Sequence, residues 1–428
     1  MQIKISSASV VTESDVTKVS IPLNIAGIES LLWFSFPSDY ERFLTVSVSD
    51  GIIVGVLLYA MERGYTIVSD IPVSYDLLLK LNKYLIPFLC KVNTSLKPIR
   101  IEARSSVEQF SGKHVGTGIS CGVDSLSTII YHGIDEQVSE SRVDTLTLFN
   151  TGYYGHEDNN SDRYKEYLAQ SISFANRHGF NFFSLDSNIS NIMQYDFLSA
   201  HTYLTCSALF LFQNYFRTYY YASGYPVFDF KAEFSDPAYY DVFLLSCIST
   251  SIISSNSCSL FSINIILEYF QSFFLAILLS QQLLPCCSTM TRVEKTALIR
   301  TKPEVMKSLY VCLSGKPGIN CCKCEKCVRT MLALEATGGL DNVRFCYDRK
   351  IYMKYRTRYY AYMLRHRKNN VFYKEIYEAL KLSNVPIPLA SWFCFIPCQF
   401  EVRNWIDSFS KTLVGAWLRQ VYKTIRYK

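Results

Sequence analysis

A short run of small and polar residues, from Gly116 to Ser125, is the segment of this chain best suited to bind an anion. It reads Gly-Thr-Gly-Ile-Ser-Cys-Gly-Val-Asp-Ser, and a helical pattern of apolar residues follows it at once. A strand, a glycine-containing loop and a helix in this order direct backbone N–H groups and the positive end of the helix dipole toward a phosphate. We therefore expect the following residues to contact a phosphate: Ser120, Cys121, Gly122, Val123, Asp124 and Ser125.

The residue types in this loop suggest separate roles. Ser120 and Ser125 add hydroxyl donors, Gly122 lets the backbone approach a ligand closely, and Asp124 could hold Mg²⁺. The loop is not a Walker A motif, because no Gly-Lys-Ser/Thr follows the glycines. It is not a dinucleotide-binding fingerprint either, because the third glycine is missing. An ordinary strand-to-helix turn is the alternative interpretation.

A second group of residues has the spacing of a metal site. Four of the 15 cysteines follow the pattern C-x8-C-x2-C-x2-C: Cys312, Cys321, Cys324 and Cys327. Four thiolates at such spacing can close a tetrahedral shell around Zn²⁺, and closed four-thiolate shells are structural rather than catalytic. Cys322 is adjacent but off the spacing. A redox Cys-x-x-Cys pair and a chance cluster are the alternatives.

The loop resembles the Ser-Gly-Gly-x-Asp-Ser loop of the PP-loop ATP pyrophosphatases, with Cys121 in place of one glycine. That superfamily cleaves ATP between the α- and β-phosphates. Loop and cysteine spacing together resemble the 7-cyano-7-deazaguanine synthase family of queuosine biosynthesis, over roughly residues 114–338. The resemblance implies that the loop holds pyrophosphate and Mg²⁺, that Asp124 and Ser125 are catalytic, and that the four cysteines bind zinc.

The same resemblance implies an ATP-dependent ligase. Such an enzyme adenylates a carboxylate or carbonyl oxygen, releases pyrophosphate and admits ammonia or an amine. Two alternatives stay open: a PP-loop enzyme that modifies nucleic acid, and a non-catalytic, zinc-stapled scaffold that binds a nucleotide. Cys121, the N-terminal segment, an apolar insertion and a C-terminal extension depart from the family pattern, and they leave the acceptor open.

The surrounding pattern predicts three domains. Residues 1–110 read as an α+β domain, with strands over 30–36 and 43–48 and helices over 52–61 and 75–89. From residue 111 to 345, strands alternate with helices, which is typical of a doubly wound parallel sheet. The resemblance implies that this sheet is like that of the adenine nucleotide alpha hydrolases, with a zinc-stapled segment over 312–327. Residues 346–428 read as a basic, aromatic helical extension.

Three further segments allow two interpretations each. The apolar run 263–284, within the insertion 257–287, is long enough to span a membrane, but Glu268 and several glutamines favour a buried or interface helix. The tyrosines and cations after residue 349 could bind nucleic acid, but a packed amphipathic helix is favoured. Arg292 and Lys295 could reach a phosphate, but a solvated helix start is favoured.

Composition sets the remaining expectations. The formal net charge of +6 permits an anionic ligand without demanding nucleic acid. No cleavable signal pattern opens the chain, so we expect a cytoplasmic protein with reduced thiols and no membrane span. The expected partners are ATP and a small-molecule carboxylate or carbonyl acceptor. A homodimer is one assembly that the sequence permits.

Overall fold

The computed structural model describes residues 1–153, 158–195, 197–222, 224, 282–287, 289–312 and 318–410. Its contacts divide the chain into two compact units. The first unit comprises Met1–Ser120 and Asp124–Thr289, and the second comprises Cys121–Val123 and Met290–Lys428. The domain limits predicted at residues 110 and 345 fall inside these units and stay predictions.

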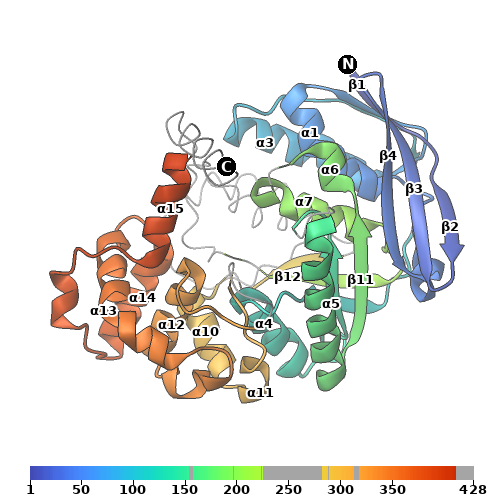
Figure 1. Ribbon diagram of the computed structural model, residues 1–428. Helices are drawn as coiled ribbons and strands as arrows, with labels where there is room; N and C mark the ends of the chain where they lie inside the picture. Colours follow the sequence, from blue (N-terminus) through green and yellow to red (C-terminus); the bar gives the residue numbers. More distant parts are fainter. Residues whose placement is uncertain are drawn as a thin grey trace, which may run out of the picture. The chain divides into compact units, whose positions relative to one another are not determined.

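The first unit is a mixed α/β structure built on one 11-stranded sheet (Figure 1). The strands follow the order β13-β12-β9-β10-β11-β4-β3-β1-β5-β7, and β2 pairs with β3. Their bounds are β1 Gln2–Ile5, β2 Ser9–Glu13, β3 Val16–Ile25, β4 Ile28–Pro37, β5 Thr66–Ser69, β7 Ile101–Glu102, β9 His114–Gly118, β10 Thr145–Asn150, β11 Asn181–Ser187, β12 Phe216–Ala222 and β13 Gln282–Cys286. A separate pair joins β6 Val73–Ser74 to β8 Ser105–Ser106.

The strands from β9 to β13 form one parallel part of this sheet, and β1, β5 and β7 form another. β9 pairs in parallel with β10 on one side and with β12 on the other. β11 lies beyond β10, and β13 lies beyond β12, both also in parallel. β11 then pairs antiparallel with β4, through Asp186 opposite Ser35 and Ser187 opposite Phe34. The N-terminal strands therefore continue the sheet of the segment that follows them in sequence.

Two N-terminal strands were predicted, and one prediction was wrong. β4 covers the predicted strand over 30–36. The predicted strand over 43–48 does not form; Phe43 instead ends the 3-10 helix η1, Ser38–Phe43. The N–H of Thr45 donates to the carbonyl of Leu211, which follows a helix, at 2.8 Å. The β-branched residues of this run are thus held by a helix end and not by a neighbouring strand.

Among the helices of the first unit, one pair, α1 (Asp50–Arg63) and α7 (Phe197–Phe210), packs closely because small residues line the contact. The bounds of the other described helices are α2 Tyr75–Lys80, η2 Leu81–Leu85, α3 Ile86–Val92, α4 Val123–Ile129, η3 Ile130–Ile134, α5 Asp158–His178 and α6 Ile189–Met193. α1 packs against α7. A Cβ on Gly51 would lie 2.5 Å from the carbonyl oxygen of Ser207. Glycine is therefore required for this close approach of two helix backbones.

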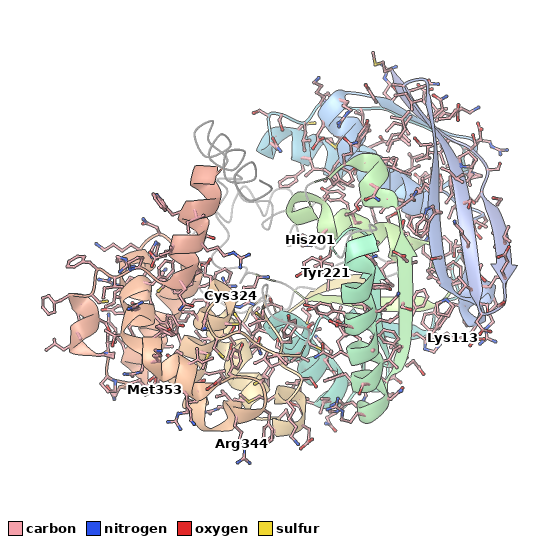
Figure 2. All side chains as sticks on the ribbon, viewed as in Figure 1. Lys113, His201, Tyr221, Cys324, Arg344 and Met353 are labelled. Carbon is pink, nitrogen blue, oxygen red and sulfur yellow. The ribbon has the colours of Figure 1, made fainter. Side chains whose placement is uncertain are left out.

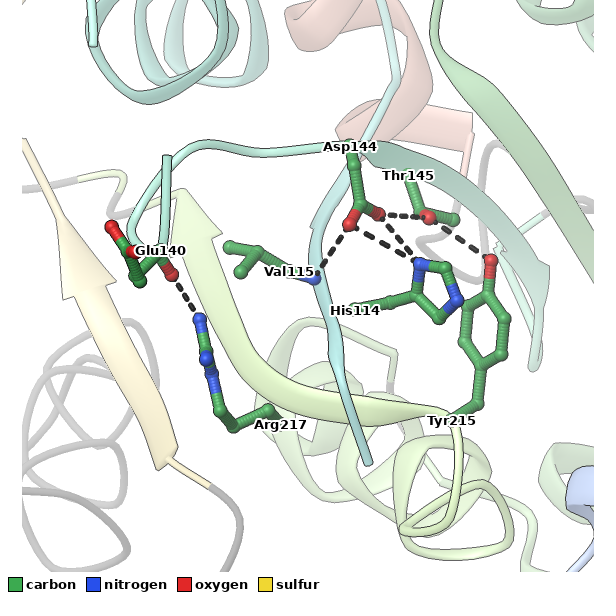
Figure 3. Close-up of polar contacts among 7 residues, drawn as sticks. All are labelled: His114, Val115, Glu140, Asp144, Thr145, Tyr215 and Arg217. Carbon is green, nitrogen blue, oxygen red and sulfur yellow. Dashed lines mark hydrogen bonds and ion pairs between the residues drawn. The ribbon is translucent and has the colours of Figure 1, made fainter. Parts of the chain in front are cut away.

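A polar cluster fixes the amino ends of β9 and β10 (Figure 3). Nδ1 of His114 lies 3.2 Å from both carboxylate oxygens of Asp144. The hydroxyl of Thr145 lies 3.1 Å from that of Tyr215, whose ring stacks on His114 with centroids 4.1 Å apart. Arg217 on β12 donates to the carbonyl of Glu140. These contacts hold the three central strands in register at the end opposite to the predicted phosphate loop.

The second unit is helical in its described residues. Its elements are α10 Arg292–Arg300, α11 Pro303–Met306, α12 Glu325–Ala336, η5 Leu340–Phe345, α13 Arg349–His366, α14 Val371–Leu382, η6 Leu389–Trp392 and α15 Gln399–Ser410. Side chains cap three of these helices. Thr291 and Glu294 form a capping box before α10, Asp348 caps α13, and Asn370 caps α14. The helical extension predicted from residue 346 is therefore helical over most of its described length.

The predicted apolar run 263–284 lies largely outside the described residues. Its last residues belong to β13, so the end of the run is a strand and not a helix. None of the helices in the described ranges combines the length and the apolarity that a bilayer-spanning segment requires.

Candidate functional site

The predicted phosphate loop connects the central parallel strand β9 to α4. β9 has a glycine at position 116 because the ring of Phe216 on β12 lies close to its backbone there. A Cβ on Gly116 would lie 2.5 Å from that ring. The N–H of Ile119 donates to the carbonyl of Thr147 at 2.9 Å, so the ladder continues one residue past the strand. The chain then turns through Ser120, Cys121 and Gly122 and enters α4 at Val123, which is buried.

Two predicted site residues meet across the loop. The N–H of Ser120 donates to Oγ of Ser125 at 3.3 Å, and the two hydroxyl oxygens lie 3.1 Å apart. Ser120 is exposed, whereas Ser125 is buried in the first turn of α4. Asp124 is half-buried, and its carbonyl accepts from the hydroxyls of Ser127 and Thr128. The serines, the backbone N–H groups and one carboxylate are thus brought together at the end of one strand.

Cys121 adopts a backbone conformation that favours glycine. Its φ is +55°, in the left-handed region, and its carbonyl accepts from the N–H of Tyr310 at 2.8 Å. A side chain in this region strains the backbone. The position therefore has the geometry of a glycine, although the sequence has cysteine there.

We expect Cys121→Gly to be more stable than Cys121→Ala, by about 1 kcal/mol of unfolding free energy. Both variants remove the same buried thiol, but only glycine removes the left-handed strain. Denaturant unfolding of the two purified variants measures the difference. An alanine variant as stable as the glycine variant would show that the backbone at Cys121 is not left-handed.

Sequence reasoning missed two polar residues at the ends of the neighbouring strands. Asn150 ends β10 and is buried, and Asp186 lies opposite it in β11. Nδ2 of Asn150 donates to Oδ1 of Asp186 at 2.8 Å. Each of the two strands ends in a polar residue. The carboxyl ends of parallel strands meet at one sheet edge, so these polar ends were the available signal.

A further polar pair lies at the carboxyl end of β12. Nδ1 of His201, on α7, lies 2.6 Å from the hydroxyl of Tyr221, and the two residues are adjacent in Figure 2. Beside them, the hydroxyl of Tyr219 lies 2.6 Å from that of Thr147, across β12 and β10.

The four predicted cysteines come together in the second unit. Their Sγ atoms all lie within 4.8 Å of one another, so Cys312, Cys321, Cys324 and Cys327 could hold a metal ion. Two pairs, Cys321–Cys327 and Cys312–Cys324, are 4.0 Å apart. Zn–S bonds of 2.3 Å in a tetrahedron place sulfurs about 3.8 Å apart. The donor set and its spacing therefore fit Zn²⁺ closely.

Backbone N–H groups surround these sulfurs. Sγ of Cys321 lies 3.4 Å from the N–H of Lys323 and 3.3 Å from the N–H of Cys324. Sγ of Cys312 lies 3.4 Å from the N–H of Cys321. A donor that points at sulfur favours the thiolate over the thiol. The turn of chain between the second and third cysteines is thus prepared for anionic sulfur.

In the absence of a bound cation, the close approach of the four sulfur atoms opposes ionisation of the Cys327 thiol. Hydrogen bonds with Cys321 and Cys324, followed by burial, raise the pKa of the Cys327 thiol. A coordinating divalent ion reverses this preference and deprotonates the thiol outright. Cys322 does not belong to the group: its sulfur is buried, accepts from the N–H of Asp348 at 3.2 Å, and has a pKa that burial raises to about 11.

The tyrosines of the basic extension are largely buried, as the packed-helix interpretation predicted. Tyr352, Tyr359 and Tyr360 on α13 lie in the core of the second unit. The hydroxyl of Tyr359 donates to the carbonyl of Cys322 at 2.9 Å. Arg356 forms two hydrogen bonds with one carboxylate oxygen of Glu335, at 2.8 and 2.6 Å. These rings therefore pack inside the protein and do not offer their faces to bases.

One expectation about a charged residue was wrong. Lys295 was expected on a solvated helix start, but only 1% of its surface is exposed. The helix start itself was placed correctly, because α10 begins at Arg292 after a capping box of Thr291 and Glu294. An ammonium group is rarely buried without an anionic or polar partner. Lys295 is buried because it lies on the side of α10 that packs inside the unit, together with Val293, Thr296 and Ile299.

A surface hollow of about 360 Å³ lies elsewhere, on α2 and η2. Its lining consists of Tyr75, Leu78, Leu79, Asn82 and Lys83. These residues include no carboxylate, thiol or imidazole. We therefore assign it no catalytic role.

No protein-family model, no curated protein and no solved structure matches this chain.

Proposed function

We propose that this chain is an ATP-dependent enzyme of the PP-loop type, with the pyrophosphate end of ATP bound at the loop Ser120–Ser125. The observation that carries the proposal is the place of this loop in the sheet. β9 is central: β10 and β11 lie on one side of it, and β12 and β13 lie on the other. Numbered along the chain, these five parallel strands lie in the order 3-2-1-4-5, which is also found in doubly wound sheets, where ligands bind at the point at which the order reverses.

The residues of the loop suit a polyphosphate. Backbone N–H groups at Cys121 and Gly122 and the hydroxyls of Ser120 and Ser125 supply donors without a positive side chain. Cys121 has a positive φ, whereas Ser120 and Gly122 do not. This alternation turns successive backbone N–H groups toward one concave side, which is a common way to bind anions. Asp124, half-buried at the start of α4, is the carboxylate that would hold Mg²⁺.

The chemistry then follows from positioning. An acceptor carboxylate or carbonyl oxygen attacks the α-phosphorus of ATP, the bond to the β-phosphate oxygen breaks, and pyrophosphate leaves. Ammonia or an amine attacks the adenylated carbon, and AMP departs with the acceptor oxygen. Mg²⁺, when bound, neutralises charge on the leaving pyrophosphate. The protein supplies orientation and oriented donors, and it needs no covalent nucleophile.

The cysteine group has a separate role in this proposal. Four thiolates leave no open coordination position on Zn²⁺, so the ion would stabilise the fold and not act on substrate. Cys324 is the N-cap residue of α12, and Cys327 lies in its first turn. Zinc would therefore fix the start of α12, which contacts α10, α13 and α14.

Two other functions share parts of this site. A nucleic-acid-modifying enzyme would use the same loop, but the buried tyrosines of α13 argue against base stacking there. A non-catalytic scaffold would bind ATP and leave it intact. Product analysis separates a scaffold from an enzyme.

Binding of ATP tests the proposal first. We expect the full-length protein to bind ATP with Mg²⁺ in isothermal titration calorimetry, and pyrophosphate to compete, whereas adenosine alone should compete weakly. Ser125→Ala removes a buried hydroxyl that faces Ser120, and we expect it to weaken ATP binding roughly tenfold, as for loss of one hydrogen bond to a charged group. Ser139→Ala, at an exposed serine outside the loop, is the control for loss of a serine hydroxyl elsewhere. Equal affinity of the two variants for ATP would place the phosphates elsewhere.

A further inference from the structure

An exposed apolar patch lies near the C-terminal end of the described chain. It consists of Trp392, Phe393, Phe395, Ile396, Trp405 and Ile406. The exposed fractions are large: 72% for Phe393, 87% for Phe395 and 68% for Trp405. Single exposed apolar side chains are ordinary, but contiguous ones mark an interaction surface.

The two parts of the patch are held together by one arginine. Arg365, in the last turn of α13, donates to the carbonyl of Cys394 at 3.2 Å. The same guanidinium binds both carboxylate oxygens of Glu401 on α15, at 3.1 and 3.0 Å. Trp405 lies one turn beyond Glu401 on the same helix face. The loop that carries Phe393 and Phe395 therefore adjoins the face of α15 that carries Trp405.

Positive charge borders the patch. The end of α13 and the turn after it read Arg365-His366-Arg367-Lys368, and the guanidinium of Arg367 lies 5.6 Å from the centre of the Trp392 ring. Glu401 is already engaged, because it accepts from Arg365 and from the N–H of Cys398. Over the whole extension 346–428, 16 Lys and Arg residues stand against 5 Asp and Glu residues. This part of the chain is therefore strongly cationic, although the chain as a whole carries only +6.

We propose that this patch attaches the protein to the anionic phospholipid surface of a membrane, without spanning it. Tryptophan and phenylalanine side chains enter the boundary between headgroups and acyl chains, and nearby lysine and arginine residues bind the anionic headgroups. The aliphatic residues Ile396 and Ile406 decide between lipid and nucleic acid. Bases stack on aromatic faces and gain little from exposed isoleucine, whereas a bilayer accepts both kinds of side chain. The inference is independent of the ATP site.

Vesicle co-sedimentation of the full-length protein tests this proposal. We expect binding to vesicles of phosphatidylcholine with phosphatidylserine, weakened by salt, and little binding to phosphatidylcholine alone. Phe393→Ser combined with Phe395→Ser should reduce the affinity at least roughly tenfold, because two exposed rings lose their place in the acyl region. Lys368→Gln should reduce it about fivefold, as for the loss of one cation near an anionic surface. Quenching of tryptophan fluorescence by brominated lipid should follow the same ranking.

Matched control variants distinguish membrane attachment through this patch from nonspecific hydrophobic adsorption. Ile28→Ser combined with Val107→Ser removes two equally exposed apolar side chains from the first unit, and it should leave vesicle binding unchanged. All the substituted side chains are exposed, so the melting temperature should not change. Failure of the full-length protein to bind the anionic vesicles would refute the proposal. So would binding that survives the phenylalanine substitutions.

Two further outcomes would assign the patch to another partner and overturn the proposal. If the phenylalanine substitutions abolish binding of a single-stranded RNA oligonucleotide while vesicle binding is unaffected, the patch binds bases. If they abolish self-association in sedimentation velocity and vesicles do not bind, the patch joins two copies of the chain.

Discussion

Cys324→Ser is expected to remove bound zinc and to destabilise the second unit severely. Purified wild-type protein should carry about one Zn²⁺ per chain, and the variant should carry much less. Structural zinc contributes about 10–16 kcal/mol of apparent binding free energy in zinc-finger peptides, and this energy is also folding energy. Loss of one of four ligands should therefore lower the unfolding free energy by several kcal/mol. Elemental analysis and thermal unfolding measure the two effects.

The neighbouring Cys322 provides a closely matched control. It is buried beside the four cysteines, but its sulfur accepts a hydrogen bond from the backbone N–H of Asp348 and is not one of the four proposed metal ligands. A serine hydroxyl there can still accept that N–H. We expect Cys322→Ser to retain zinc and to cost only about 1 kcal/mol. Protein prepared without chelators that contains no zinc, or equal destabilisation by the two substitutions, would contradict a zinc site.

Asp124→Ala is expected to lower the rate of pyrophosphate release roughly a hundredfold or more. The carboxylate is half-buried at the start of α4, where it would place Mg²⁺ against the departing pyrophosphate. Removal of one preorganised electrostatic group from an active site has an effect of this size. The fold should persist, because the hydroxyls of Ser127 and Thr128 bond to the backbone carbonyl of Asp124, which alanine keeps.

Two further variants, Asp124→Asn and Asp135→Ala, distinguish loss of the Asp124 charge from a general effect of removing a carboxylate. Asp124→Asn keeps the size of the side chain and should lose nearly as much activity as Asp124→Ala. Asp135→Ala, at an exposed aspartate after the same helical segment, should behave as wild type. ATP binding should persist in all three, since backbone N–H groups make many of the expected contacts. Full activity of Asp124→Ala would remove this residue from the site.

Local patterns were sufficient to predict several elements. The apolar run before Asn150 forms β10, the small residues after β9 form the loop into α4, and a helix begins at Arg292 as expected. Each of these depends on neighbours within a few positions. The cysteine group was also predictable, because its spacing alone restricts how four sulfurs can meet.

Other features depend on contacts between distant residues. The pairing of β4 with β11 joins residues about 150 positions apart, and nothing local specifies it. The run 43–48 has strand-forming residues, but a helix end supplies its partner. The burial of Lys295 and the exposure of Phe395 follow from which helix faces pack together. Propensity cannot decide such cases, because tertiary packing overrides it.

Cleavage of ATP between the α- and β-phosphates is the proposed reaction of this chain. The most direct measurement is the identity of the products formed from ATP and Mg²⁺ by the wild-type protein, with candidate carboxylates and ammonia supplied. The proposed function predicts AMP and pyrophosphate in equal amounts, and their loss in Asp124→Ala. ADP and phosphate, or ATP that stays intact while bound to the loop, would contradict it.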